Sequence, residues 1–131
     1  MKRLQESQDI FNIPATTAAN TTYTRYIDVR NAQDGSIQIN WTAGAGGGTL
    51  SYIVEASTIE AKNELDAESK DVGDVFQDIG LLLLGATELT GDSFITDSAG
   101  IIGRMTWLKF EATVANRDNA TALASRINLC Y

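Results

Sequence analysis

The stretch Ser36-Ile37-Gln38-Ile39-Asn40-Trp41-Thr42 indicates the fold class of this chain. Its apolar residues Ile37, Ile39 and Trp41 alternate with polar ones, and successive side chains of a β-strand point to opposite faces. The alternation therefore predicts a strand with one buried and one solvated face. The dipeptide Asp34-Gly35, just before it, predicts a tight turn.

The same two-residue period recurs along most of the chain. It predicts further strands over 21–29, 49–57, 75–79, 86–90, 93–96, 105–114 and 122–131. About seven short strands with Gly, Asn and Asp turns, and no long amphipathic helix, are typical of an antiparallel β-sandwich, immunoglobulin-like or jelly-roll-like. We expect Trp41 and Phe110 to be core aromatics. Trp107 faces the other way, so we expect it to be exposed for binding or buried at an interface.

The connections between these strands predict local pairing. We expect 49–57 to pair antiparallel with 36–42, and 105–114 to form a hairpin with 122–131. The Gly-rich link 43–48 lacks the Gly-Lys-Ser/Thr ending of a phosphate-binding loop, so a hairpin loop is the better interpretation. The apolar run Leu81-Leu82-Leu83-Leu84 fits either a buried strand or a helical turn.

The N-terminal 20 residues show no sustained period. They carry an apolar group, Ile10, Phe11 and Ile13, ahead of Pro14. We predict an extended N-terminal arm over 1–20 and a β-sandwich domain over 21–131, with the three apolar side chains docking on this domain or on a neighbouring subunit. Ile10, Phe11 and Ile13, together with Trp107, are therefore the candidate interface residues.

Composition excludes several classes of function. The chain has 131 residues, 10 Lys and Arg against 17 Asp and Glu, and no His. Without His, neither a Ser-His-Asp triad nor an imidazole-based zinc site is possible, and no other catalytic motif occurs. We therefore predict a protein that is not an enzyme and that holds no cofactor or metal. A net charge of -7 argues against nucleic acid binding, and the polar start and short apolar runs argue against a signal peptide or a membrane segment.

Acidic residues concentrate in one excursion. Between residues 60 and 78 seven acids stand against two bases. Charge runs of this kind are usually solvated, so we predict a solvated loop with a short helix near 59–67. Clustered carboxylates also suit calcium, but Asp71-Val72-Gly73-Asp74 is too sparse to specify a site.

Several segments carry a family resemblance over about residues 22–131. They are the strand 35–42, its Gly-rich link, the strand 48–57, Phe76-Gln77-Asp78-Ile79, Thr90-Gly91-Asp92-Ser93 and the closing pair from Trp107-Leu108-Lys109-Phe110 to Ile127-Asn128. Together they resemble small β-sandwich virion proteins of tailed bacteriophages. Phe76 stands where that family usually has Trp, and the excursion 58–75 is longer and more acidic than the family pattern. The motifs are structural rather than catalytic.

The resemblance implies a virion protein made in the host cytoplasm. The predicted arm over 1–20 is similar to the extended arms of capsid cement proteins, and this resemblance implies a decoration subunit on the capsid surface. Its partners would be the major capsid protein and further copies of itself. The alternative is a binding module of a tail or fibre, for instance a carbohydrate-binding one, that uses exposed aromatics such as Tyr23, Tyr52 and Trp107.

Overall fold

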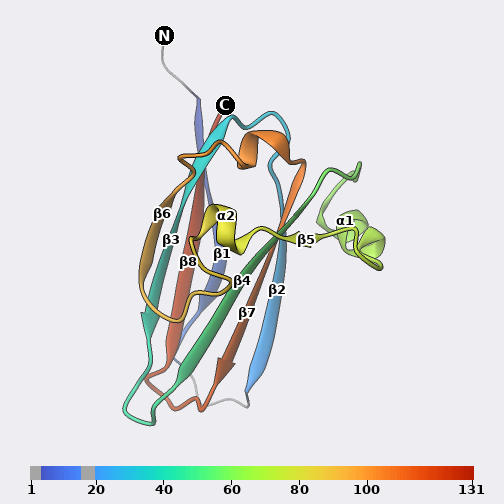
Figure 1. Cartoon of the computed structure of the whole chain (residues 1–131). Coiled ribbons are helices and arrows are strands. Elements are labelled where there is room, and N and C mark those ends of the chain that lie inside the picture. Colours follow the sequence, from blue (N-terminus) through green and yellow to red (C-terminus); the bar gives the residue numbers. More distant parts are fainter. Residues whose placement is uncertain (1–3, 16–19) are drawn as a thin grey trace.

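The computed structural model describes residues 4–15 and 20–131 (Figure 1). Its strands are β1 (Gln5–Ile13), β2 (Thr21–Asp28), β3 (Asp34–Thr42), β4 (Thr49–Ser57), β5 (Gln77–Asp78), β6 (Ser93–Thr96), β7 (Trp107–Ala115) and β8 (Ala122–Cys130). Its helical segments are α1 (Glu64–Lys70), α2 (Gly80–Leu83) and the 3-10 turn η1 (Ile102–Arg104). The predicted strand 86–90 contributes only an isolated bridge, between Leu89 and Tyr52.

The strands form two antiparallel sheets that enclose one apolar core. Sheet A has the order β1-β8-β3-β6 and sheet B the order β2-β7-β4-β5. This confirms the predicted all-β sandwich. Apart from β4 and β5, strands that follow one another in sequence lie in opposite sheets, which is the strand order of a jelly roll rather than an immunoglobulin domain.

Two predicted pairings are wrong. β3 pairs with β8 and β6 rather than with β4, and β7 pairs with β2 and β4 rather than with β8. The links 43–48 and 116–121 cross between the sheets instead of closing hairpins. The turn predicted at Asp34-Gly35 is also misplaced, because both residues belong to β3 and the chain turns near Asn31, whose φ is +69°.

The expected N-terminal arm is largely a strand of the sandwich. β1 pairs with β8 from Gln5 opposite Cys130 to Ile13 opposite Leu123. The predicted domain boundary after residue 20 is therefore corrected: the sandwich begins at Gln5. A β-bulge between Asp9 and Phe11 allows two consecutive residues, Ile10 and Phe11, to be buried, and this interrupts the two-residue period. Residues 1–3 and 16–19 of the predicted arm lie outside the described part.

The core lies between the inward faces of the two sheets. Phe110 is fully buried, as expected, whereas Trp41 is only partly buried and packs against the core. The rings of Phe11 and Phe110 both contact that of Tyr52, with centroids 5.8 and 6.2 Å away. The Tyr52 hydroxyl donates a 2.9 Å hydrogen bond to Ser125 Oγ, so both buried groups have a partner.

The Gly-rich link is shaped around a carboxylate. Asp118 accepts hydrogen bonds from the backbone N–H groups of Gly46, at 2.6 Å, and Ala120, at 2.8 Å. These bonds lower the pKa of Asp118. Gly44 has a φ of +82°, and a Cβ there would collide with the Asp118 carboxylate. The glycines thus let the Asp118 carboxylate approach the backbone closely. This accounts for the Gly-rich sequence without a bound phosphate group.

Candidate functional site

The outer face of sheet B is covered by the acidic excursion. Trp107 is only 2% exposed and lies in a second apolar cluster with Tyr26, Ala61, Ala67 and Phe76. α1 projects from this side of the sandwich in Figure 1. The expectation that Trp107 is exposed or faces another subunit is therefore corrected, because residues of its own chain bury it.

Ion pairs and hydrogen bonds hold the excursion against the sheet. Glu64 accepts two hydrogen bonds from Arg25 Nε, at 3.0 and 3.1 Å, and one from the Tyr26 backbone N–H, at 2.9 Å. Asp71 accepts from Lys109 Nζ at 2.6 Å and from the Tyr26 hydroxyl at 2.7 Å. The predicted solvated loop is thus corrected in part, since these two carboxylates serve as contacts to sheet B.

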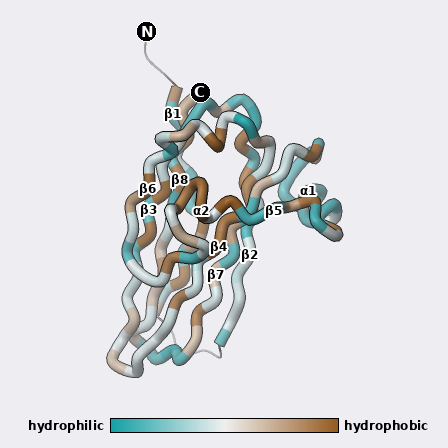
Figure 2. Tube along the Cα trace, in the orientation of Figure 1, coloured by the Kyte–Doolittle hydropathy of each residue, from teal (hydrophilic) through white to brown (hydrophobic). Residues whose placement is uncertain are grey.

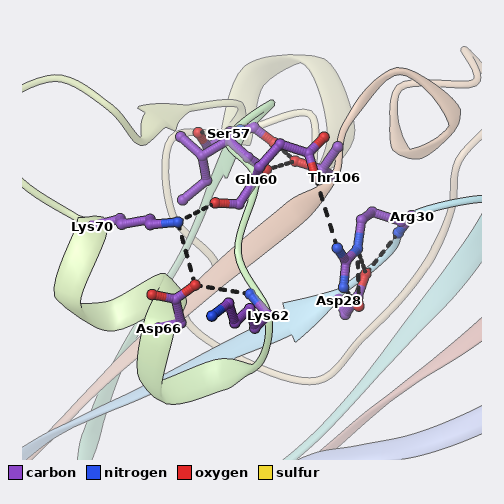
Figure 3. A network of polar contacts seen from close by, with 9 residues as sticks. Asp28, Arg30, Ser57, Glu60, Lys62, Asp66, Lys70 and Thr106 are labelled. Carbon is purple, nitrogen blue, oxygen red and sulfur yellow. Dashed lines mark hydrogen bonds and ion pairs between the residues drawn. The ribbon is translucent and has the colours of Figure 1, made fainter.

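The excursion also bonds to itself, as Figure 3 shows. Lys70 Nζ donates to the Glu60 carbonyl at 2.6 Å and lies 3.3 Å from Asp66, which also accepts from the Lys62 backbone N–H. The helix is at Glu64–Lys70, a few residues later than predicted, because the Asn63 side chain caps it by accepting from the Asp66 N–H. The excursion is therefore ordered, and we call residues 58–75 the flap.

The contacts of Asp71 shift three pKa values. Burial opposes ionisation of Asp71, but the hydrogen bonds from Lys109 and Tyr26 outweigh it and lower the Asp71 pKa. Burial likewise opposes the charge on Lys109, yet Asp71 and Glu55 raise the Lys109 pKa. Burial, and then the bond to Asp71, raises the pKa of the Tyr26 phenol.

These shifts predict loss of stability at both ends of the pH range. Because folding lowers the Asp71 pKa, its contribution is complete above the unfolded value, about 4, and disappears as the pH falls through the folded value. Because folding raises the Lys109 and Tyr26 pKa values, their contribution is complete below about pH 10 and declines above it. Urea unfolding of wild type and Asp71→Asn checks this: the difference in unfolding free energy should shrink below about pH 4. Asp74→Asn, at an exposed carboxylate, is the control, and a pH-independent difference would contradict the assignment.

The candidate interface residues are internal. Ile10 and Phe11 are 2% and 6% exposed, and Ile13 is half-buried against the same core. Of the two expected docking partners, it is this domain that the three side chains contact, so they are core residues of the sandwich rather than interface residues. Tyr52 is fully buried, and Tyr23 is half-buried with its hydroxyl accepting from Arg117 Nη1 at 2.6 Å. Together with Trp107, these aromatics therefore form no exposed binding platform.

Large apolar side chains are exposed elsewhere. The run Leu81–Leu84 forms a helical turn that buries Leu83 and Leu84 and exposes Leu81 and Leu82 by 69% and 67%. Figure 2 shows this apolar segment at α2. The four consecutive leucines drew attention to this segment in the sequence, but the sequence did not show which of them are buried and which are exposed. Phe94 of β6 is 67% exposed.

The outer face of sheet A is mostly polar across β1, β8 and β3, and β6 at its edge adds the exposed Phe94 opposite Gln38. The register places Gln38, Arg126 and Asp9 in one row across β3, β8 and β1, and Asn40, Ala124 and Asn12 in the next. α1 contacts β2 and α2 contacts β4, both in sheet B. Among the residues that the structure describes, no group of three or more His, Cys, Asp or Glu is placed to hold a metal ion.

Comparison with known proteins supports the fold class. No protein-family model and no curated protein matches the chain. The crystal structure of the SPBc2 prophage-derived protein YomS is similar, with a TM-score of 0.60 and 6% identity over 100% of this chain and 96% of that one. A structure of infectious bursal disease virus, Gx strain, aligns with a TM-score of 0.43 and 11% identity over 99% of this chain and 32% of that one. The likeness to YomS shows a shared sandwich fold. Within 4–15 and 20–131, no helix is long and apolar enough to cross a membrane.

Proposed function

We propose that this chain is a structural component of a bacteriophage virion, and specifically a decoration or cement subunit that binds the major capsid protein on the outside of the head. Three observations support the proposal. The fold is a jelly roll, an architecture used in viral capsids. A prophage-derived protein shares the fold along nearly its whole length. The strand motifs resemble those of small virion proteins. The protein would act by binding, without catalysis.

The observation that carries the proposal is the exposed leucine pair of α2. Leu81 and Leu82 are adjacent and mostly exposed, whereas the next two leucines, Leu83 and Leu84, are buried. Burial of one leucine side chain contributes about 1.5–3 kcal/mol, so the pair provides a modest contact for each subunit. Repetition over a symmetric lattice would increase the total strength without further chemistry. We therefore propose the leucine pair as the capsid contact in place of Ile10, Phe11 and Ile13, which pack in the core of the sandwich.

The double variant Leu81→Ser/Leu82→Ser tests the contact. We expect its affinity for particles that lack this protein to fall by roughly tenfold or more, because two buried side chains are lost. Leu65→Ser is the matched control, since Leu65 is a 75% exposed leucine on α1. Sedimentation of the variants with particles measures the occupancy, and circular dichroism checks that both remain folded. Equal occupancy of the two variants would remove α2 from the interface.

Electron cryo-microscopy of the particle tests the location. Density between capsomers on the head would agree with a decoration subunit, and the same maps would show whether copies of the chain contact one another. Density at the tail or a fibre would contradict the proposal in favour of the alternative, a tail-associated binding module.

A further inference from the structure

A hollow of about 220 Å³ opens on the outer face of sheet A. Asp9, Phe11, Asn12, Asn40, Ala124 and Arg126 line it. Ala124 lies between the two asparagines in the cross-strand row, so a methyl group stands where its neighbours carry amides. Side chains that are opposite on adjacent strands have Cβ atoms about 5 Å apart, so the amides form two walls around a low floor. The hollow therefore results from one small residue in the middle strand.

The β-bulge of β1 lies at the same place. It falls between Asp9 and Phe11, both of which line the hollow. A bulge bends its strand and changes the direction of nearby side chains, and bulges are frequent beside binding sites. Phe11 borders the hollow, but its ring is 6% exposed and packs in the core, so the exposed methyl group of Ala124 is the apolar surface of the hollow. The hollow thus combines a small apolar surface with a polar rim.

The polar rim has unused hydrogen-bonding capacity. Within the described chain, the side chains of Asn12, Asn40 and Arg126 make no hydrogen bond or ion pair. On the outer face of sheet B, in contrast, Lys109 is paired with the Asp71 carboxylate. Each amide offers two donors and an acceptor, and Arg126 adds donors only. These groups are available to a ligand that both donates and accepts.

The charge of the hollow narrows the class of ligand. Its lining holds one carboxylate, Asp9, and one guanidinium, Arg126, so its formal charges cancel. The whole chain carries -7, which disfavours polyanions. A neutral ligand rich in hydroxyl groups matches both the absence of net charge and the mixed donors and acceptors. A volume of about 220 Å³ has room for a single ring rather than a chain of rings.

We propose that this hollow binds one ring of a neutral saccharide. The Asn12 and Asn40 amides would each exchange hydrogen bonds with ring hydroxyls, Arg126 would donate to one, and Asp9 would accept from one. The ring's C–H groups would lie on the exposed methyl group of Ala124. The site goes beyond a structural role in the virion, and it differs from the alternative based on Tyr23, Tyr52 and Trp107 because recognition is by hydrogen bonds rather than by an aromatic platform.

Titration of the ¹⁵N-labelled full chain with glucose, galactose, mannose and N-acetylglucosamine, followed by NMR, tests the proposal. We expect at least one sugar to shift the signals of Asn12, Asn40, Ala124 and Arg126 with millimolar affinity. Asn40→Ala should weaken that binding by about fivefold to tenfold, since it removes hydrogen bonds to the ligand. Ala124→Leu should abolish it by filling the floor. Asn128→Ala is the matched control for Asn40→Ala, because Asn128 lies on the same outer face, in β8 with Ala124 and Arg126, but does not line the hollow.

Three outcomes would overturn the inference. The first is the absence of shifts with all four sugars, and the second is an Asn128→Ala effect equal to that of Asn40→Ala. The third is association of the wild type into an oligomer that Ala124→Leu dissociates in analytical ultracentrifugation, which would make this face a contact between copies. Particle binding by Asn40→Ala separates this site from the proposed capsid contact, because it should remain at the wild-type level.

Discussion

A chain that begins at Ala15 should lose the cooperative unfolding transition of the full-length protein. It lacks β1, which pairs with β8 along its length and supplies Ile10 and Phe11 to the core. Burial of each of these side chains contributes about 1.5–3 kcal/mol, and domains of this size have only about 5–15 kcal/mol in total. The truncation also leaves β8 as an exposed edge, which favours aggregation. Circular dichroism during heating measures the transition.

Point variants refine this expectation. Phe11→Ala should reduce the unfolding free energy by about 3–5 kcal/mol, because Phe11 contacts Tyr52 in the core. Asn12→Ala, at the next and exposed position, should change it by less than about 0.5 kcal/mol. A truncated chain that melts at the full-length temperature would instead show that residues 1–14 are a dispensable arm. The experiment therefore separates a strand of the sandwich from an appendage that serves only to dock on neighbours.

Lys109→Ala should release the flap from sheet B. Lys109 Nζ lies 2.6 Å from Asp71 and 3.5 Å from Glu55, and its side chain is only 17% exposed. Removal of one partner from a buried pair costs about 3–5 kcal/mol, and the slight exposure here places the effect near 3 kcal/mol. The loss should be local, because the flap's apolar cluster is separate from the main core. The flap should therefore open while the sandwich stays folded.

Hydrogen exchange and tryptophan fluorescence measure this opening. Backbone amides of α1 and residues 71–76 should exchange faster in Lys109→Ala, and emission from Trp107 should shift to longer wavelength as water reaches it. Lys62→Ala is the control, since the Lys62 contact to Asp66 uses the backbone N–H, which the substitution keeps. The pair Lys109→Met/Asp71→Asn should recover part of the stability, because it leaves no uncompensated charge at Asp71. Unchanged exchange in Lys109→Ala would show that apolar contacts alone hold the flap.

The two outer faces of the sandwich have different chemistry as a result. On sheet B, Lys109 is paired with Asp71 of the flap, and the flap covers the cluster around Trp107. On sheet A the polar side chains around Ala124 are unpaired within the described chain and surround a hollow. Sheet A therefore exposes polar groups around the hollow, whereas α2 and Phe94 of β6 expose large apolar side chains.

Local alternation in the sequence determined where most strands lie and which of their sides is buried. Ile37, Ile39 and Phe110 are core residues as expected, because a two-residue period depends only on the geometry of a single strand. Composition likewise determined that no imidazole-based site is possible. These properties need no knowledge of which segments meet in space.

The tertiary structure alone decided which strands are neighbours and what covers each face. A Gly-rich link of six residues closes a hairpin or crosses between sheets equally well, so β3 and β4 looked like partners although they lie in opposite sheets. The bulge in β1 interrupts the two-residue period, so this strand was not predicted. Trp107 is buried by an excursion that is distant from it in sequence. The hollow joins residues of β1, β3 and β8. Such contacts depend on the closure of long loops, whose outcome is set by the packing of the whole chain rather than by the pattern of any one segment.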